Sequence, residues 1–500
     1  MSDADFSSVE QRLPAYGFAK RHGVLVTEYC DGRALIAHSP KAGASALTEL
    51  RRFVACPADY QAVSEQQFER LLHTVYEHKS GQSRQMVEDL HDNLDLSDMA
   101  AHLPTPEDLL ESADEAPIIR LINALLTEAV KENASDIHIE PYEARMVVRF
   151  RVDGVLREII EPPRELAPMV ISRLKVMAKL DIAEKRLPQD GRISLNIGGR
   201  TVDVRVSTLP SGHGERVVLR LLDKQANQLT LKQVGMADNE LASIQQMIAR
   251  PHGIILVTGP TGSGKTTSLY AIVNQLNERS RNILTVEDPI EYYLDGIGQT
   301  QVNSKVEMTF AKGLRAILRQ DPDVVMVGEI RDRETAEIAV QASLTGHLVL
   351  STLHTNTAVG AITRLRDMGV EPFLLASSLV GVIAQRLVRR LCPQCRQPET
   401  VTGRDLSRLG YVGAPDDRLS IYREQGCPQC FNHGYKGRAG IFEIVPLDGA
   451  MQQLIHDGAG DIDLERQARL SAPSIQQSAL AKVLAGETSL DEALRITMKE

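Results

Sequence analysis

Residues 259–266 read Gly-Pro-Thr-Gly-Ser-Gly-Lys-Thr. They follow the apolar run Ile254–Val257, with one residue between, and come directly before a helix-forming stretch, Thr267–Asn277. A strand, a glycine-rich loop and a helix in that order are the context that a phosphate-binding P-loop requires. The glycines let backbone N–H groups turn toward the phosphates, and the N-terminus of the following helix adds its dipole. The run therefore predicts a nucleotide site formed by Gly259, Pro260, Thr261, Gly262, Ser263, Gly264, Lys265, Thr266 and Thr267.

Two side chains of this loop have distinct expected roles. Lys265 reaches the β- and γ-phosphate oxygens, and the hydroxyl of Thr266 ligates Mg²⁺. The alternative is a glycine-rich turn that contains a lysine by accident, which arises roughly once in a hundred chains of this length. The flanking strand and helix make an accident rarer still, so we expect ATP and Mg²⁺ as ligands.

Three further short apolar runs, Ile283–Val286, Val324–Val327 and Leu348–Ser351, alternate with helix-like segments. This alternation predicts a parallel sheet with crossover helices, and therefore an α/β fold for the second half of the chain. Because parallel strands end at a common edge of the sheet, the residues that follow each run are expected beside the P-loop.

Acidic residues follow two of these strands. Glu329 comes after Val324–Val327 and one glycine, and Glu287, Asp288 and Glu291 come after Ile283–Val286. Many P-loop enzymes place an Asp directly after the strand, so a Glu behind a glycine is expected to act through water on the metal or on the attacking nucleophile. The sequence leaves open whether Glu287 or Glu329 activates water.

Two histidines, His347 and His354, bracket the run Leu348–Ser351. A lone histidine is more often structural than catalytic. Because these two flank a strand of the same sheet, His354 is a candidate sensor of the γ-phosphate.

Two identical tetrapeptides, Cys392-Pro-Gln-Cys395 and Cys427-Pro-Gln-Cys430, are separated by 31 residues. Each can present two thiolates from one turn, and together they predict a closed, structural Zn²⁺ site with four cysteine ligands. The alternatives are a redox pair or unrelated thiols. The separation exceeds that of the usual finger, so we expect a small subdomain at about 390–440. Cys30 and Cys56 have no such partners and are expected as buried small side chains.

The net charge of −10 arises in one stretch of this 500-residue chain. Residues 85–119 contain ten acidic residues and no Lys or Arg, so the rest of the chain is formally neutral. We interpret 85–116 as an acidic linker with a short helix at about Glu107–Ser112. The sequence has no stripe of basic residues of the kind that is typical of nucleic-acid binders, which makes a nucleic-acid motor less favoured.

The N-terminus has no signal-peptide pattern, which favours a protein that stays inside the cell. The most apolar of the long stretches, Phe373–Ala384, is too short for a membrane span and is interpreted as a buried helix. We therefore expect no direct membrane span.

Residues 1–84 mix strand-like and helix-like runs, which is typical of a small α/β domain. A helix-like stretch begins at Pro117, and alternating strand-like segments follow it up to about residue 225.

The run Leu318–Asp332, which reads LRQDPDVVMVGEIRD, resembles the signature of the secretion ATPases that drive bacterial type II secretion and type IV pili. The P-loop, the acidic box Glu287–Glu291, the histidine box His347–His354 and the paired cysteine motifs occur in the order of that family, over residues from about 117 onward. The overall length and the zinc insertion are most similar to the type II secretion ATPases.

The resemblance implies a PAS-like α+β domain at 117–225, a RecA-like motor domain at 226–500 with the zinc subdomain inside it, and a ring of six chains. It also implies that Arg205 and Arg220 reach the nucleotide. The alternative for this pair, from the residues alone, is cross-strand charge pairing at the surface.

The function that the resemblance implies is a cytoplasmic hexameric ATPase, peripheral on the inner membrane, that couples ATP hydrolysis to assembly of a pseudopilus and export of folded proteins from the periplasm. Its implied partner is the cytoplasmic domain of an inner-membrane type II secretion protein, bound through residues 1–84. The alternatives are a type IV pilus assembly ATPase, a nucleic-acid motor on the same fold, and a regulator that binds ATP without hydrolysing it.

Overall fold

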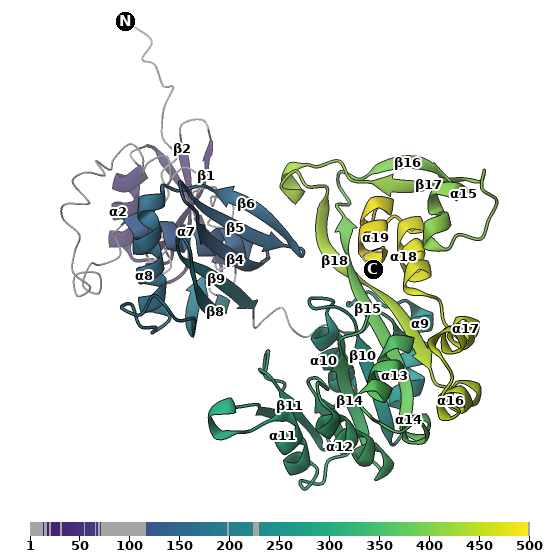
Figure 1. Ribbon diagram of the computed structural model, residues 1–500. Coiled ribbons are helices and arrows are strands. Elements are labelled where there is room, and N and C mark those ends of the chain that lie inside the picture. The colour runs from purple at the N-terminus through teal and green to yellow at the C-terminus, as the bar shows by residue number, and fades with distance from the viewer. Residues whose placement is uncertain are drawn as a thin grey trace, which may run out of the picture. The chain divides into compact units, whose positions relative to one another are not determined.

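The computed structural model describes residues 22–30, 33–54, 56–65, 117–197, 200–223 and 230–498, with a few single residues before 72 (Figure 1). The chain divides into two compact units, Met1–Asp223 and Lys224–Glu500. The acidic linker expected at 85–116, its helix at Glu107–Ser112 and the boundary expected near 225 lie outside the described residues.

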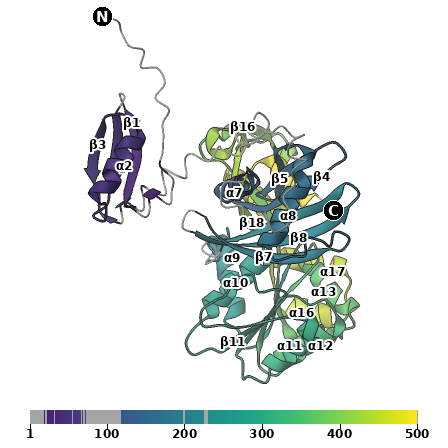
Figure 2. The same ribbon diagram turned by 90° about the vertical axis from the view of Figure 1, so that its left-hand side faces the viewer.

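The N-terminal part forms a three-stranded sheet of β1 (Val24–Cys30), β2 (Arg33–His38) and β3 (Ala58–Ala62). β1 and β2 are antiparallel, and β2 and β3 are parallel because helix α2 (Ala44–Val54) crosses over between them (Figure 2). α2 buries Ala46, Leu50 and Val54, one residue per turn, against the apolar face of the sheet. The small apolar core of this part is thus formed between one helix and one sheet.

Residues 117–223 form a six-stranded sheet whose neighbouring strands are all antiparallel, in the order β6-β5-β4-β9-β8-β7. Helices α7 and α8 pack on one face, with Leu121, Leu126 and Leu174 in the core. The opposite face carries buried acids paired with arginines. The elements are α7 (Pro117–Lys131), β4 (Ala134–Pro141), β5 (Met146–Val152), β6 (Val155–Ile160), α8 (Ala167–Met177), β7 (Gln189–Ile197), β8 (Arg200–Ser211) and β9 (Gly214–Asp223).

The second unit is built on a seven-stranded sheet in the order β12-β11-β13-β14-β10-β15-β18. All neighbours are parallel except β15 and β18. The strands are β10 (Gly253–Thr258), β11 (Ile283–Glu287), β12 (Gly298–Gln301), β13 (Val324–Val327), β14 (Leu348–Leu353), β15 (Leu379–Leu391) and β18 (Tyr435–Pro446). The α/β fold expected for this half of the chain is therefore present.

Helices cover both faces of this sheet. Alternate residues of β10 point to opposite faces, so that Ile254 and Leu256 join one core, and Ile255 and Val257 join the other. The second core lies under α9 (Asp238–Ile248) and α10 (Lys265–Leu276). The first lies under α11 (Phe310–Ile317), α12 (Arg333–Leu344), α13 (Ala358–Asp367), α14 (Pro372–Ser378), α16 (Gly449–His456) and α17 (Asp461–Ser471).

The expectation of one buried helix over Phe373–Ala384 is wrong. The helix α14 ends at Ser378, and the following residues form β15, which pairs with β10 on one side and β18 on the other. The residues Val380, Val382 and Ile383 are β-branched and favour a strand between two partners. Periodicity alone does not distinguish a short buried strand from a buried helix, and here pairing with two neighbouring strands determines the structure. Among the helices of the described residues, none combines the length and the apolarity needed to cross a bilayer.

A small subdomain follows β15. Strands β16 (Gln397–Thr402) and β17 (Arg418–Arg423) form an antiparallel pair joined through α15 (Gly403–Leu406). Helices α18 (Ile475–Leu484) and α19 (Leu490–Thr497) pack with these strands, so Val388, Ile421 and Ala479 share one apolar core. The end of the chain thereby holds the subdomain to β15.

Candidate nucleotide site and metal centre

The P-loop connects the fully buried strand β10 to helix α10, which begins at Lys265. Three of its residues have the positive φ that favours glycine, with values of 146° at Gly259, 80° at Gly262 and 87° at Gly264. A Cβ atom on Gly259 would lie 2.3 Å from the backbone carbonyl oxygen of Gln385 on β15. The loop thus needs glycine both for its turns and for its close approach to the neighbouring strand.

The ammonium of Lys265 lies within the loop. Its Nζ donates to the carbonyl oxygens of Gly259 at 2.7 Å and Pro260 at 3.1 Å. An ammonium has three N–H donors, so one remains beyond these two bonds for a phosphate oxygen. Burial lowers the pKa of Lys265, and the charge of Glu329 opposes that shift. Thr266 is exposed on the first turn of α10, and Thr267 is half-buried.

Glu329 lies two residues past the end of β13, and its two carboxylate oxygens contact two basic side chains. The guanidinium of Arg331 pairs with Oε1, and Nε2 of His354 lies 3.4 Å from Oε2. The hydrogen bond to Glu329 raises the pKa of Arg331 above its ordinary value. His354 therefore lies beside the acidic candidate at the same edge of the sheet, and its role as a sensor of the γ-phosphate stays a prediction. The sequence reasoning missed Arg331, although its position two residues after Glu329 in the quoted signature was a signal.

His347 lies at the opposite end of β14. Its carbonyl oxygen accepts from the N–H of Gly253 at the start of β10, and its Nδ1 lies 2.9 Å from the carbonyl oxygen of Ala342. This histidine holds the turn between α12 and β14. The two histidines that flank one strand thus differ in role because parallel strands place all their carboxyl ends at one edge.

Glu287, the last residue of β11, is 3% exposed and surrounded by donors. The hydroxyl of Tyr270 bonds Oε2, while Oγ1 of Thr285 at 2.6 Å and Nε2 of Gln299 at 3.0 Å bond Oε1. Burial and the nearby charge of Glu287 raise the pKa of Tyr270 above its ordinary value. Burial and the charges of Glu287 and Glu291 raise the pKa of Tyr292 to about 12. The buried carboxylate of Glu287 accepts three hydrogen bonds, whereas the partners of Glu329 are exposed side chains.

The loop that carries His354 is tied to the strand that precedes the P-loop. The hydroxyl of Thr258 lies 2.7 Å from the hydroxyl of Thr355 and 3.0 Å from its carbonyl oxygen, and it accepts from the N–H of Thr355 at 2.9 Å. The last residue of β10 therefore connects the start of the P-loop to the loop after β14. Sequence reasoning did not find this pair, because the two threonines are 97 residues apart.

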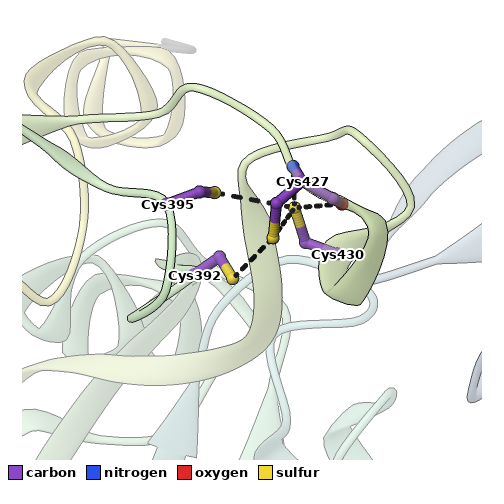
Figure 3. Close-up of side chains that lie close together, drawn as sticks. All are labelled: Cys392, Cys395, Cys427 and Cys430. Carbon is purple, nitrogen blue, oxygen red and sulfur yellow. Dashed lines mark hydrogen bonds between the residues drawn. The ribbon is translucent and has the colours of Figure 1, made fainter.

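The four sulfur atoms of Cys392, Cys395, Cys427 and Cys430 all lie within 4.8 Å of one another (Figure 3). Three of the pairs are 3.7–3.9 Å apart. A tetrahedral Zn²⁺ with bonds of about 2.3 Å requires sulfur–sulfur distances of about 3.8 Å, so this set fits zinc. Backbone N–H groups of Gly426 and Gly434 also point at the sulfurs of Cys395 and Cys430, as thiolate ligands favour.

The sequence contains two further cysteines, Cys30 and Cys56. Cys56 is half-buried beside the N-terminal core. The side chain of Cys30 lies outside the described residues.

Arg205 on β8 and Arg220 on β9 are direct register partners in the sheet of the first unit. The Nε of Arg220 donates to Oδ1 of the buried Asp136 at 2.9 Å, and its side chain is 61% exposed. Arg205 is half-buried. The cross-strand arrangement of charges is thus present, and the role of the two arginines toward a nucleotide stays a prediction.

Comparison with known proteins gives matches along the chain. A family model described as "Type II/IV secretion system protein" matches residues 111–495, and a second model, described as a domain of "GSPII protein E", matches residues 12–76. The chain is 59% identical to "Type II secretion system protein E" of Pseudomonas aeruginosa, covering 98% of this chain and 97% of that protein. It is 57% identical to "Type II secretion system ATPase E" of Vibrio cholerae, covering 99% and 98%.

Solved structures are similar over a large part of the chain. The pilus retraction motor PilT, solved with bound ADP, is 26% identical with a TM-score of 0.50, covering 75% of this chain and 96% of PilT. The ATPase DotB of Legionella pneumophila is 24% identical with a TM-score of 0.55, covering 75% and 94%. The likeness to DotB shows the fold alone.

Proposed function

The chain belongs to the type II/IV secretion system protein family, and on this premise we propose that it is the ATPase of a type II secretion system. It couples ATP hydrolysis to assembly of a pseudopilus in the inner membrane, which exports folded proteins from the periplasm. The observation that carries the proposal is the full-length similarity to type II secretion proteins E at 57–59% identity. The geometry of the P-loop supports the ATPase part.

In the proposed reaction the P-loop holds the phosphates of ATP. Backbone N–H groups and Lys265 bind the β- and γ-phosphate oxygens, and the hydroxyl of Thr266 holds Mg²⁺, which neutralises charge on the transferring phosphoryl group. The partly buried position of Lys265 strengthens its attraction to phosphate, because a low-dielectric surrounding weakens screening.

We assign activation of the attacking water to Glu329 and a positioning role to Glu287. Glu329 has partners that can move away, Arg331 and His354, whereas both oxygens of Glu287 are bonded to fixed donors. A carboxylate that must bind water in one step and release it in the next needs free lone pairs. His354 then reports the loss of the γ-phosphate through its contact with Glu329.

The four cysteines hold a structural Zn²⁺. A set of four cysteine sulfurs within 4.8 Å of one another supplies all the ligands of a tetrahedral zinc, which suits a structural rather than a catalytic metal. The zinc would link the turn after β15 to the turn before β18 and so fix the subdomain between them.

We also propose a ring of six chains in which Arg205 and Arg220, from a PAS-like domain, reach the nucleotide. The support is the family resemblance and the position of both arginines on adjacent strands. An arginine that meets phosphate only in a closed arrangement stabilises the transition state more than the ground state.

Residues 1–84 are the proposed docking domain for the cytoplasmic part of an inner-membrane type II secretion protein. The match of residues 12–76 to the second family model, a domain of "GSPII protein E", supports this assignment. A cytoplasmic protein recruited in this way would be peripheral on the inner membrane.

We expect a chain that starts near Glu115 to keep basal ATP hydrolysis, to leave the membrane fraction and to fail in secretion. Continued secretion by that truncation would remove the docking role.

Complementation tests the proposed function. The gene for this protein, expressed in a bacterium that lacks its own type II secretion ATPase, should restore export of a secreted enzyme to the medium, and Lys265→Ala should not. Restored pilus assembly without restored export would replace the proposal by a pilus assembly ATPase.

A further inference from the structure

Gln385 lies on β15 directly beside the P-loop, and neither the sequence motifs nor the proposed chemistry accounts for it. Residue Ala384 pairs with Thr258, the last residue of β10, so Gln385 lies one step past the end of that strand. Its side chain is fully buried, with 0% exposure. Figure 1 shows β15 next to β10, with α10 nearby.

One end of the Gln385 amide is fixed. The hydroxyl of Ser268, on the first turn of α10, donates to Oε1 of Gln385 at 2.7 Å. Both residues are fully buried. This bond sets the amide orientation and leaves Nε2, with its two N–H donors, at the other end.

The other end of the amide faces the P-loop without an acceptor. Nε2 of Gln385 has no hydrogen-bond partner, and a Cβ atom built on Gly264 would lie 2.9 Å from it. The side chain of Leu387, on the same face of β15, lies 3.6 Å from the same point. Nε2 is therefore aimed at the turn that leads from the loop into α10, on the packed side of the loop next to β15.

A second polar atom of the loop has no partner either. The hydroxyl of Ser263 is buried and unpaired, and it lies 2.8 Å from the Cβ position of Gly259, which is also 2.3 Å from the backbone oxygen of Gln385. A buried donor without an acceptor destabilises the fold that contains it. Two such groups against one glycine-rich loop indicate that the loop has a second arrangement in which they are bonded.

We propose that Gln385 is a positioning residue for the P-loop: held by Ser268, its amide N–H groups donate to a backbone carbonyl oxygen of residues 259–264 when the loop closes on phosphate. The assignment rests on the proposed ATPase function and deepens it. The acceptor is a loop carbonyl, because Nε2 and the side chain of Leu387 both lie beside Gly264, on the packed side of the loop. Nucleotide binding then gains a hydrogen bond that the protein alone lacks.

A double variant tests the proposal on the full-length protein. In Ser268→Ala/Gln385→Met both partners of the existing bond become apolar groups of similar size, which costs a folded protein little. We expect ADP, titrated with Mg²⁺ in a calorimeter, to bind about three- to tenfold more weakly, as the loss of one neutral hydrogen bond predicts. The melting temperature without nucleotide should be unchanged or higher, and the rise that ADP gives should be smaller.

Ser343→Ala is the matched control, because its hydroxyl is buried and bonds only within α12, away from the loop. It should bind ADP as the wild type does. If the double variant does not fold, Gln385→Glu keeps an oxygen for Ser268, removes the N–H donors and should weaken ADP binding likewise.

An ADP dissociation constant equal to that of the wild type in either test would overturn the proposal, and a lower melting temperature without nucleotide would then make Gln385 an ordinary core residue. ATP hydrolysis by the wild-type preparation is measured in parallel. Its absence would contradict the proposed function, whereas its presence with unchanged ADP binding in the variants contradicts only the role of Gln385.

Discussion

The nucleotide edge of the motor sheet and the cysteine cluster are two candidate ligand sites in the same unit, and they differ in access to solvent. At the nucleotide edge Thr266 is exposed, and the His354 side chain is 51% exposed. At the cluster three of the four cysteines are buried. A site of ATP turnover must let nucleotide enter and leave, and its side chains must change partners. A structural metal site must instead be shielded from solvent by its ligands. The two sites should therefore respond oppositely to substitution, one in rate and the other in stability.

Loss of one zinc ligand should give the largest effect. Structural zinc contributes about 10–16 kcal/mol in small domains, so Cys392→Ser is expected to unfold the subdomain and lower the melting temperature of the whole unit. Metal analysis should find one Zn²⁺ per wild-type chain. Less than half an equivalent of Zn²⁺ per chain, with cysteine thiols free to titrate, would contradict the assignment of the four cysteines as a metal centre.

Substitution of each of the two glutamates by glutamine distinguishes a catalytic role from a structural role within the nucleotide edge. Glu329→Gln should lower turnover by about 10²–10⁴-fold, the contribution typical of a general base, and leave ADP affinity within a few fold. Glu287→Gln should instead cost about 1–3 kcal/mol of stability, since its amide would face the donors of Tyr270 or Gln299. Full turnover in Glu329→Gln would transfer the assignment to Glu287.

The arginines of the first unit should have a smaller effect. Arg205→Ala and Arg220→Ala are expected to lower turnover by roughly 10–10²-fold, with ATP affinity nearly unchanged, because their proposed contact forms in the transition state. Arg164→Ala in the same unit is the control. Wild-type turnover in both variants would return the two arginines to the alternative of cross-strand charge pairing, which Arg220 shows with Asp136.

The smallest expected effect is a pH dependence at Tyr292. Its folded pKa of about 12 exceeds the ordinary value of 10, so the proton is held more tightly in the folded state. The associated stability is present below pH 10 and is lost as the pH rises toward 12. The difference in unfolding free energy between wild type and Tyr292→Phe should therefore shrink over that interval. A difference independent of pH would contradict the shift.

Local motifs predicted most of both sites, because the residues of a P-loop or of a cysteine pair are close in sequence. The runs Gly259–Thr266 and Val324–Val327 and both cysteine pairs could be read directly. The bonds of Ser268 to Gln385 and of Thr258 to Thr355 could not, since they join residues 117 and 97 positions apart. The start of β15, Leu379–Ala384, was likewise expected to be helical, because its two neighbours in the sheet decide its structure.

The most direct test of the account is steady-state ATP hydrolysis by the purified full-length protein and by Lys265→Ala. We predict hydrolysis by the wild type and a rate at least about 10²-fold lower in Lys265→Ala. A neutral side chain cannot offset the negative charge on the transferring phosphoryl group. Lys232→Ala, an exposed lysine of the same unit, should keep wild-type turnover. Hydrolysis by Lys265→Ala at the wild-type rate would contradict the assignment of residues 259–266 as the site of ATP turnover.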